Sequence, residues 1–247
     1  PCISTYEDLP VTRLRVIDLE TTGIEPPAEI IEFGRADVVT GGGTAEIERP
    51  MARLYRPLGG IPPETKAVHH ITEADFDDQT PVCTPERLRQ AVWGGETPDV
   101  LVAHNAEFER QFVTPEVTAG LPWICTYKVA LHLWPDAPRH SNQVLRYWRE
   151  LSIDPAYAMP PHRAGPDAWV TAHVLVELLK ETTIEQMIAW TEEPKHLPAI
   201  PFGKHRGMKW AEAPVDYLQW MVRQTDMDRD ALAGAERELL RRRSAGR

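Results

Sequence analysis

Four acidic residues and one histidine are spaced along the chain in a way that suits the binding of two divalent cations. Asp18 and Glu20 lie in RVIDLETTG, Glu109 lies in LVAHNAEFERQF, and His162 and Asp167 lie in HRAGPDA. Hard cations such as Mg²⁺ prefer carboxylate oxygens, and a pair of such cations can clamp a phosphodiester group. Each segment alone is weak evidence, but together they predict metal-dependent cleavage of phosphodiester bonds.

The first two carboxylates follow a short apolar stretch, Arg13 to Asp18, whose β-branched residues predict a strand. Side chains two apart on a strand point to the same face, so Asp18 and Glu20 can present their carboxylates together. Two carboxylates held this close repel, and one resists ionising unless a cation lies between them. We expect Thr21-Thr22-Gly23 to break the strand. Taken alone, this pair would more often be two solvated acids.

The other candidate residues are expected at the beginnings of helices. Phe108 and Phe112 are four residues apart and share a buried face, from which Glu109 is rotated away. Its simplest alternative role is that of an exposed helix acid. A long helix is expected from near Pro166 to about Lys180, with Asp167 in its first turn, where the helix dipole stabilises an anion. His162 would lie on the preceding loop. It either folds back over the site or is a surface histidine without a role in it.

The order D-x-E-T-T-G, H-N-A-x-F-acid and H-R-A-x-x-D resembles the DEDDh group of DnaQ-like 3′→5′ exonucleases. The stretches AVHHIT at 67–72 and WICT at 123–126 are similar to further motifs of that family, and WP, HSN, FGKHRG and YLxW between 134 and 220 resemble its exonuclease X branch. Glu109 departs from the aspartate usual there, so we expect activity with an altered metal preference. Gly165-Pro166 is a second departure, because a continuous helix is more usual.

The resemblance implies an α/β fold of ribonuclease H-like type, with a mixed five-stranded sheet flanked by helices and a small C-terminal α+β module. The exonuclease domain is expected over 10–190 and the basic C-terminal module over 195–247. We expect strands at 13–18, 30–39, 51–56, 99–103 and 122–125, and helices near 84–92, 106–113, 126–133, 142–150 and 166–180. A loose hairpin turn is expected at Gly41–Gly43.

The resemblance also implies two Mg²⁺ ions, with Mn²⁺ as an expected substitute, and release of nucleoside 5′-monophosphates from DNA 3′ ends. Asp18 would bridge both ions, Glu20, Glu109 and Asp167 would complete their shells, and His162 would act as general base. The terminal nucleotide is expected near Thr21, Gly23, Ile24, His104 and Asn105. A buried core role for Ile24 is equally open.

The C-terminal residues suggest a further contact with nucleic acid. Phe202 to Gly207 is expected to form a short strand with a basic turn, and Lys204 and Arg206 near Phe202 and Trp210 suit phosphate and base contacts. Solvated charge is the simpler interpretation for either basic residue. The whole module could equally pack against the first domain and only stabilise it.

Composition limits the remaining classes. The net charge is −10, but residues 195–247 hold 11 Lys and Arg against 7 Asp and Glu. The three cysteines form no disulfide framework and there is no long apolar run, so we expect a cytoplasmic protein without membrane contact. Expected partners are DNA with a 3′ end, single-stranded or duplex, and a protein in a repair or defence complex. The alternatives are an exoribonuclease and a catalytically weak nucleic-acid-binding subunit.

Overall fold

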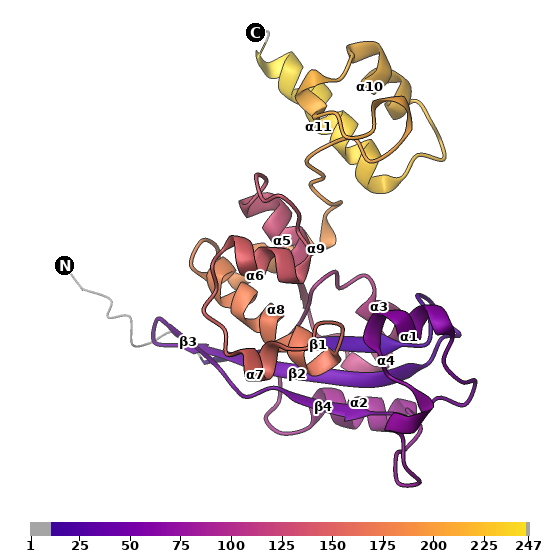
Figure 1. The fold of residues 1–247 in the computed structure, drawn as a ribbon. Coiled ribbons are helices and arrows are strands. Elements are labelled where there is room, and N and C mark those ends of the chain that lie inside the picture. The colour runs from indigo at the N-terminus through magenta and orange to yellow at the C-terminus, as the bar shows by residue number, and fades with distance from the viewer. Residues whose placement is uncertain (1–10, 246–247) are drawn as a thin grey trace, which may run out of the picture.

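A mixed β-sheet with helices on both faces forms the larger part of the chain, and the computed structural model describes residues 11–245 (Figure 1). Its central strand β1 pairs antiparallel with β2 and parallel with β5, and β5 pairs parallel with β6. The strands are β1 (Thr12–Thr21), β2 (Ile30–Gly41), β3 (Thr44–Ile47), β4 (Met51–Leu54), β5 (Val100–Ala103) and β6 (Trp123–Cys125).

One edge of the sheet consists of two short strands, which lie end to end along the same side of β2. β3 pairs with Val38–Gly41 of β2, and β4 pairs with Glu32–Arg35 of the same strand. Pro50 lies in the gap between them and has no backbone N–H to donate. The predicted five-stranded mixed sheet is therefore confirmed, with β3 as an unpredicted half of the edge strand. The Gly41–Gly43 turn leads into β3, and the strand expected to reach residue 56 ends at Leu54.

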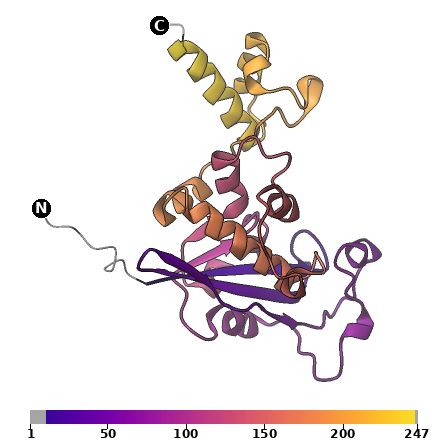
Figure 2. The ribbon, with the colours of Figure 1, turned by 60° about the vertical axis from the view of Figure 1, so that its left-hand side comes forward.

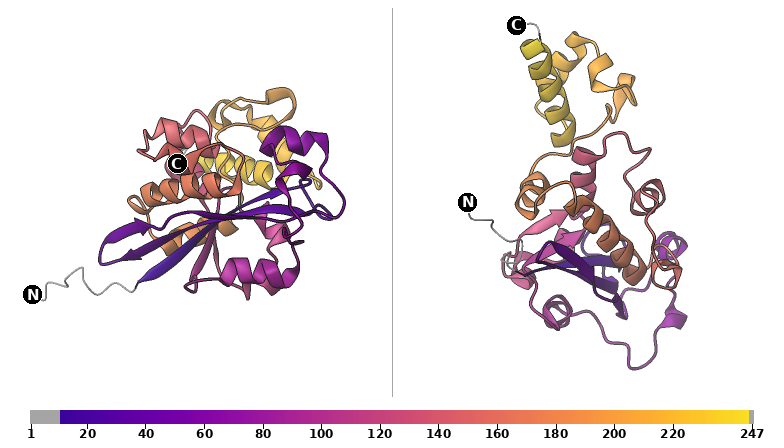
Figure 3. Two further views of the ribbon diagram at one scale, coloured as in Figure 1. Left: turned by 60° about the horizontal axis from the view of Figure 1, so that its bottom comes forward. Right: turned by 90° about the vertical axis from the view of Figure 1, so that its left-hand side faces the viewer.

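The alternation of side chains along β1 divides the core into two layers. Leu14 and Val16 face the helix α8 (Ala164–Leu179), whereas Ile17 and Leu19 face the helix α2 (Pro85–Trp93). Figure 3 shows these two helices on opposite sides of the sheet. Because side chains two apart share a face, Asp18 and Glu20 continue the row that points toward α8.

The remaining helices of this part complete the two layers. They are α1 (Pro63–His69), η2 (Glu73–Asp75), α3 (Glu109–Phe112), α4 (Pro115–Thr118), α5 (Thr126–Leu133), α6 (Asn142–Trp148), α7 (Pro155–Ala158) and α9 (Ile184–Glu192). α1, η2, α4 and α7 are short and were not expected. The helix expected over 106–113 is only one turn long, because residues 104–108 form turns.

The N-terminal end of α8 lies directly against β2 and β4. A Cβ atom at Gly34 would lie 2.1 Å from the backbone of Ala164, and one at Gly165 would lie 3.1 Å from the Ala52 Cβ. Glycine is therefore required by close backbone approach at Gly34. The helix begins at Ala164, two residues before the expected Pro166, so Gly165-Pro166 belongs to its first turn and does not interrupt it.

The C-terminal part is helical and stands at one end of the molecule (Figures 1 and 2). It contains η3 (Gly203–His205), η4 (Trp210–Glu212), α10 (Val215–Val222) and α11 (Arg229–Ala245), and it has its own buried cluster around Ile200, Leu218, Met221, Ala231 and Ala235. The strand expected at Phe202–Gly207 is wrong: these residues form a 3₁₀ turn, flanked by a single bridge between Ala199 and Lys209. In residues 11–245 no helix combines the length and apolarity needed to cross a membrane.

Candidate active site

A cleft of about 300 Å³ lies where the carboxyl end of β1 meets α1, α3 and the start of α8. Its walls come from segments far apart in the sequence, and Figure 1 shows α1 and α3 at this end of the sheet. The cleft is lined by Asp18, Leu19, Glu20, Thr21, Gly23, Ile24, Thr65, Val68, His69, His104, Asn105, Phe108, Glu109, His162 and Asp167.

Three of the four predicted carboxylates are in mutual reach. One oxygen from each of Asp18, Glu20 and Asp167 lies within 4.8 Å of the others. Asp18 and Glu20 reach this point on the α8 face of β1, and Asp167 reaches it from the first turn of α8. Oxygen donors gathered in this way, with few cations near them, form a site that fits hard divalent cations.

The electrostatics of the cleft favour a bound cation. Burial, followed by the charge of Asp167, raises the pKa of Asp18 well above its usual value. The same two causes raise the pKa of Glu20 to about 8. Burial also raises the pKa of Asp167, although a hydrogen bond from the His162 backbone opposes this shift. Without a compensating positive charge, part of this cluster would hold protons at neutral pH.

The loop before α8 is folded back onto Asp167. The His162 N–H donates to Asp167 Oδ2 at 2.7 Å, and Gln143 Nε2 donates to Oδ1 at 3.2 Å. His162 itself adopts a left-handed backbone with φ of 58°, and its exposed side chain borders the cleft. This turn gives His162 the place over the cleft that the loop before the helix was expected to give it.

An ion pair between the partly exposed Arg163 and the buried Glu32 fixes the same loop to β2. Glu32 accepts hydrogen bonds from Arg163 Nε at 3.0 Å, from Arg163 Nη2 at 2.6 Å and from the Ala164 N–H at 2.8 Å. The pair is bidentate, and such pairs fix geometry as well as charge. Glu32 therefore holds the start of α8, and with it His162 and Asp167, against the sheet. Neither Glu32 nor Gln143 was a predicted site residue.

Glu109 lies in the cleft but outside the group of three carboxylates. It is the first residue of α3 and only 3% exposed, so it is not the exposed helix acid of the simpler interpretation. Burial raises its pKa to about 8, and its Oε2 atom is buried without a hydrogen-bond partner among residues 11–245. A buried carboxylate oxygen without a partner is costly, which makes it a candidate ligand.

The residues after β1 form an open rim. The Thr21 hydroxyl donates to the Gly23 carbonyl, and the Thr22 Oγ1 atom accepts the Glu29 N–H at 2.8 Å. Ile24 is 81% exposed at the mouth of the cleft, which rules out the core role considered for it. β1 continues through Glu20 and Thr21, so the predicted break begins at Thr22.

His104 and Asn105 also line the cleft, but His104 has little free hydrogen-bonding capacity. Its Nδ1 atom contacts the Thr126 hydroxyl at 2.9 Å, and its Nε2 atom contacts the His140 carbonyl at 2.8 Å. Burial lowers the pKa of its imidazole to about 4, so the ring is neutral. Asn105 is exposed with φ of 73°, a conformation that asparagine adopts more readily than most residues.

Helix α1 adds residues that the sequence did not assign to the site. Thr65, Val68 and His69 line the cleft. His69 Nδ1 accepts the Ile71 N–H at 2.9 Å, whereas its buried Nε2 atom has no partner in the part of the chain that the structure describes. The only signal was the AVHHIT motif. Lys204 and Arg206 do not line the cleft; both are exposed, and Lys204 borders a separate hollow with Tyr217 and Trp220.

Comparison with known proteins places these features in a family. An exonuclease model of the RNase T type matches residues 16–175. Exodeoxyribonuclease 10 of Escherichia coli strain K12 is 36% identical over 218 residues, which cover 86% of this chain and 92% of that protein.

Solved structures agree with that match. The structure of exonuclease X in complex with 5′ overhanging duplex DNA is 37% identical, with a TM-score of 0.60, and covers 72% of this chain and 99% of that one. The nuclease domain of 3′hExo, described as a DEDDh family member, is 21% identical with a TM-score of 0.50, covers 68% of this chain and 92% of that one, and supports the fold alone. The predicted ribonuclease H-like exonuclease fold is confirmed.

Proposed function

The chain belongs to the DEDDh, or DnaQ-like, family of exonucleases, and from that premise we propose that it is a 3′→5′ exodeoxyribonuclease that depends on divalent metal ions and releases nucleoside 5′-monophosphates. The observation that carries the proposal is the group formed by Asp18, Glu20 and Asp167 at the end of β1. The name exodeoxyribonuclease of the Escherichia coli relative supports DNA as the substrate.

The carboxylates fit two Mg²⁺ ions, with Mn²⁺ as a substitute. Asp18, Glu20 and Asp167 would hold them together, and the unpartnered Oε2 atom of Glu109 would complete the set from α3. Bound there, divalent cations supply charge stabilisation at the scissile phosphate and lower the pKa of water. The protein's own part is to hold four carboxyl groups close together in a half-buried cleft, where a bound cation would favour their ionised form.

His162 would take the proton from the attacking water at a ring nitrogen. Its side chain is exposed at the cleft, while its backbone is fixed to Asp167 and its neighbour Arg163 is fixed to Glu32. Histidine is the side chain that most often serves as a general base. His162→Gln should lower kcat by about 10²-fold, the usual scale of general-base catalysis. Metal binding, measured by calorimetry, should persist; unchanged kcat would contradict the role.

The rim of the cleft would receive the 3′-terminal nucleotide. Thr21, Gly23 and Asn105 would offer polar and backbone contacts, and the exposed Ile24 side chain would pack against the last base. The His104 ring, with both nitrogens in contact with protein, would contribute its surface. An apolar side chain at the mouth of the cleft can pack against the face of a base and remove apolar surface from water.

Lys204 and Arg206 would act in capture of the strand outside the cleft. Both are exposed, and Lys204 borders a hollow with Tyr217 and Trp220, whose rings are stacked with centroids 5.4 Å apart. Trp220 is 44% exposed, so a base could stack on it, while basic side chains contact phosphates. We propose that the protein acts in DNA repair, end trimming or defence, together with a protein partner.

The decisive experiment follows digestion of matched oligonucleotides labelled at the 3′ or 5′ end. With Mg²⁺, the 3′ label should appear first as a nucleoside 5′-monophosphate, and a chelator should stop the reaction. Asp18→Asn and Asp167→Asn should each abolish it without unfolding the protein. Digestion of RNA in preference to DNA would replace the proposal with an exoribonuclease, and metal-independent activity would remove it.

A further inference from the structure

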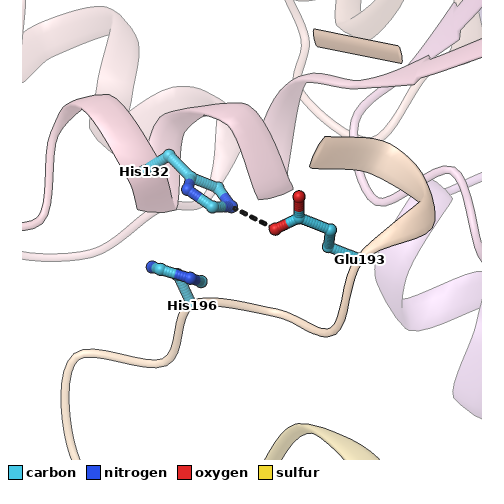
Figure 4. Close-up of side chains that lie close together, drawn as sticks. All are labelled: His132, Glu193 and His196. Atoms are coloured by element: carbon cyan, nitrogen blue, oxygen red, sulfur yellow. Dashed lines mark ion pairs between the residues drawn. The ribbon is translucent and has the colours of Figure 1, made fainter. Parts of the chain in front are cut away.

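A second group of possible metal ligands lies away from the cleft, where the two parts of the chain are joined. His132 lies near the end of α5, Glu193 caps the end of α9, and His196 lies in the segment that leads to the C-terminal part (Figure 4). One ligand atom from each lies within 4.8 Å of the others. The group contains two imidazoles and one carboxylate, unlike the all-carboxylate group of the cleft.

His132 has an unsatisfied nitrogen that points toward this group. Its ring is stacked between Trp190, at 4.6 Å between centroids, and His196, at 3.9 Å. The side chain is only 10% exposed, and its Nε2 atom is buried without a hydrogen-bond partner in residues 11–245. The nearest Glu193 oxygen lies 3.9 Å away, too far for a hydrogen bond. A buried imidazole nitrogen in this situation is available to a ligand.

The backbone around the other two ligands is already anchored. Lys128 Nζ donates to the carbonyls of Thr191 and Glu193, each at 2.8 Å. The Lys195 N–H donates to Asp230 Oδ1 at 2.8 Å, and Lys195 Nζ lies 2.6 Å from Glu107 Oε2. Residues on either side of Pro194 are therefore fixed to both parts of the chain. Ordering Glu193 and His196 around an ion would cost little additional backbone entropy.

We propose that His132 Nε2, a Glu193 oxygen and a His196 ring nitrogen bind one divalent transition-metal ion of the Zn²⁺ class. Two imidazoles with one carboxylate suit zinc, whereas Mg²⁺ prefers an all-oxygen shell. Water would complete the coordination. The ion would tie the joining segment to α5, and so would fix where the C-terminal part leaves the exonuclease domain.

The group must close slightly around the ion. Ligand atoms on a tetrahedral zinc lie about 3.3 Å apart, given metal–ligand bonds of about 2.0–2.1 Å. The 3.9 Å between His132 Nε2 and Glu193 Oε2 must therefore shorten, and the His196 ring must turn out of its stack so that its lone pair, which lies in the ring plane, meets the ion. His196 is partly exposed and has room to turn.

Arg237 opposes a cation at this place, which gives the proposal a distinctive test. Its guanidinium donates to the Lys195 carbonyl at 3.1 Å, and its charge adds to the effect of burial in lowering the pKa of both His132 and His196. If the group binds metal, Arg237→Gln should tighten binding. If the group is only an aromatic stack, no metal binds, and Arg237→Gln should leave that result unchanged.

The experiment uses the full chain carrying Asp18→Asn and Asp167→Asn, so that the cleft does not compete for metal. Zn²⁺ is titrated by calorimetry, and Co²⁺ by its visible absorption. We expect one ion per chain, with binding weakened at least about tenfold by His132→Gln or His196→Gln. Arg237→Gln should strengthen it. His205→Gln, a histidine of the C-terminal part outside the group, is the matched control and should change nothing.

Protease sensitivity gives a readout that does not depend on affinity. Zn²⁺ should slow cleavage between residues 193 and 200 in the parent protein and leave the rate unchanged in the His196→Gln variant. His196 is partly exposed, so this variant keeps the test decisive if His132→Gln does not fold. Failure to bind Zn²⁺, or binding that survives both histidine substitutions, would overturn the proposal.

Discussion

Glu109 occupies the position where the family resemblance leads us to expect an aspartate. Its surroundings make the charge state of its carboxyl group important. Its carboxylate is buried in the cleft with one unpartnered oxygen, and burial raises its pKa to about 8. A Gln side chain has nearly the same shape but no charge. The residue therefore allows the contribution of charge to be separated from that of packing.

We expect Glu109→Gln to lower kcat by about 10²-fold or more, the scale for loss of an electrostatic group that stabilises a transition state. Glu109→Asp should keep measurable activity with a changed ratio of Mg²⁺ to Mn²⁺ rates, because the carboxylate remains but is shorter. Glu116→Gln, an exposed acid on α4, serves as the control. A Gln variant as active as the wild type would show that Glu109 is not a ligand.

The same burial predicts how the metal-free protein responds to pH. The pKa of Glu20 and Glu109 is about 8 in the folded chain, against about 4.3 for an unfolded one. The folded state thus binds more protons at these two carboxyls, and its stability should fall as the pH rises from about 6.5 to about 8. Below about 6.5 the lowered pKa of the buried His104 acts in the opposite direction. Melting temperatures of chelator-treated protein would measure this. Mg²⁺ should reverse the trend, and Glu109→Gln should weaken it; a rising melting temperature would contradict it.

Individual site residues could be predicted where they lie in a local motif. Asp18, Glu20, His162 and Asp167 each belong to a short pattern next to a predicted element. Glu32 does not: its partner Arg163 is 131 positions away, and nothing near it in the sequence indicates that contact. The positions of Gln143 and His69 likewise depend on tertiary packing, which local patterns do not contain.

At the scale of elements, the site depends on how closely α8 can approach β2. That approach requires the absence of a side chain at Gly34, because an added Cβ would collide with the Ala164 backbone. The contact also places Glu32 against Arg163 and the Ala164 N–H. One small residue on β2 therefore controls the positions of His162 and Asp167.

Gly34→Ala should destabilise the protein by about 1–3 kcal/mol, the usual cost of overpacking a close contact. It should also reduce kcat, because α8 must move away from β2 and carries Asp167 with it. Gly59→Ala is the control, since a Cβ there meets only the flexible end of Glu29. Urea denaturation and turnover measure the two effects. If both variants behave alike, the close approach does not position the site.

Elements with a clear apolar pattern were predictable, including the short buried strands β5 and β6, whereas several single-turn helices were not. The long helix expected from near Pro166 to about Lys180 corresponds to α8, and the short β-branched stretch before Asp18 indicated β1. The single-turn helices α4 and α7 have too few residues to show a period, whereas α3 lies within the helix expected over 106–113. β3 was missed because it is four residues long and only partly buried.

At the scale of the molecule, charge is divided between two parts with separate cores. Residues 195–247 hold 11 basic and 7 acidic residues, whereas the rest of the chain holds 16 and 30. The uneven charge and the family resemblance indicated this division in the sequence. The position of the C-terminal part could not be predicted, because it depends on the few contacts of residues 193–196 with α5 and α11.

The proposed capture role predicts a change in affinity without a change in chemistry. Lys204→Gln combined with Arg206→Gln should raise KM, leave kcat unchanged and reduce the salt slope of single-strand binding by up to about 1.4, since each lost phosphate contact removes about 0.7. Arg223→Gln with Arg243→Gln removes the same charge from other exposed positions of this part and is the control. Equal effects of the two pairs would indicate general electrostatic attraction, and no effect would favour a packing role.

The side chains of β1 alternate between two faces, and this alternation limits which insertions and deletions the gene can tolerate. Asp18 and Glu20 face α8 only because they continue the row of Leu14 and Val16. A one-codon deletion or insertion between Val16 and Asp18 would turn both carboxylates toward the α2 side and expose the core row to the cleft. A single substitution at the site changes one side chain and leaves the others in place. A change of length in β1 between Val16 and Asp18 would instead disrupt the fold and the activity together. We therefore expect insertions in natural variants to be confined to loops such as residues 57–62 and to be absent from β1.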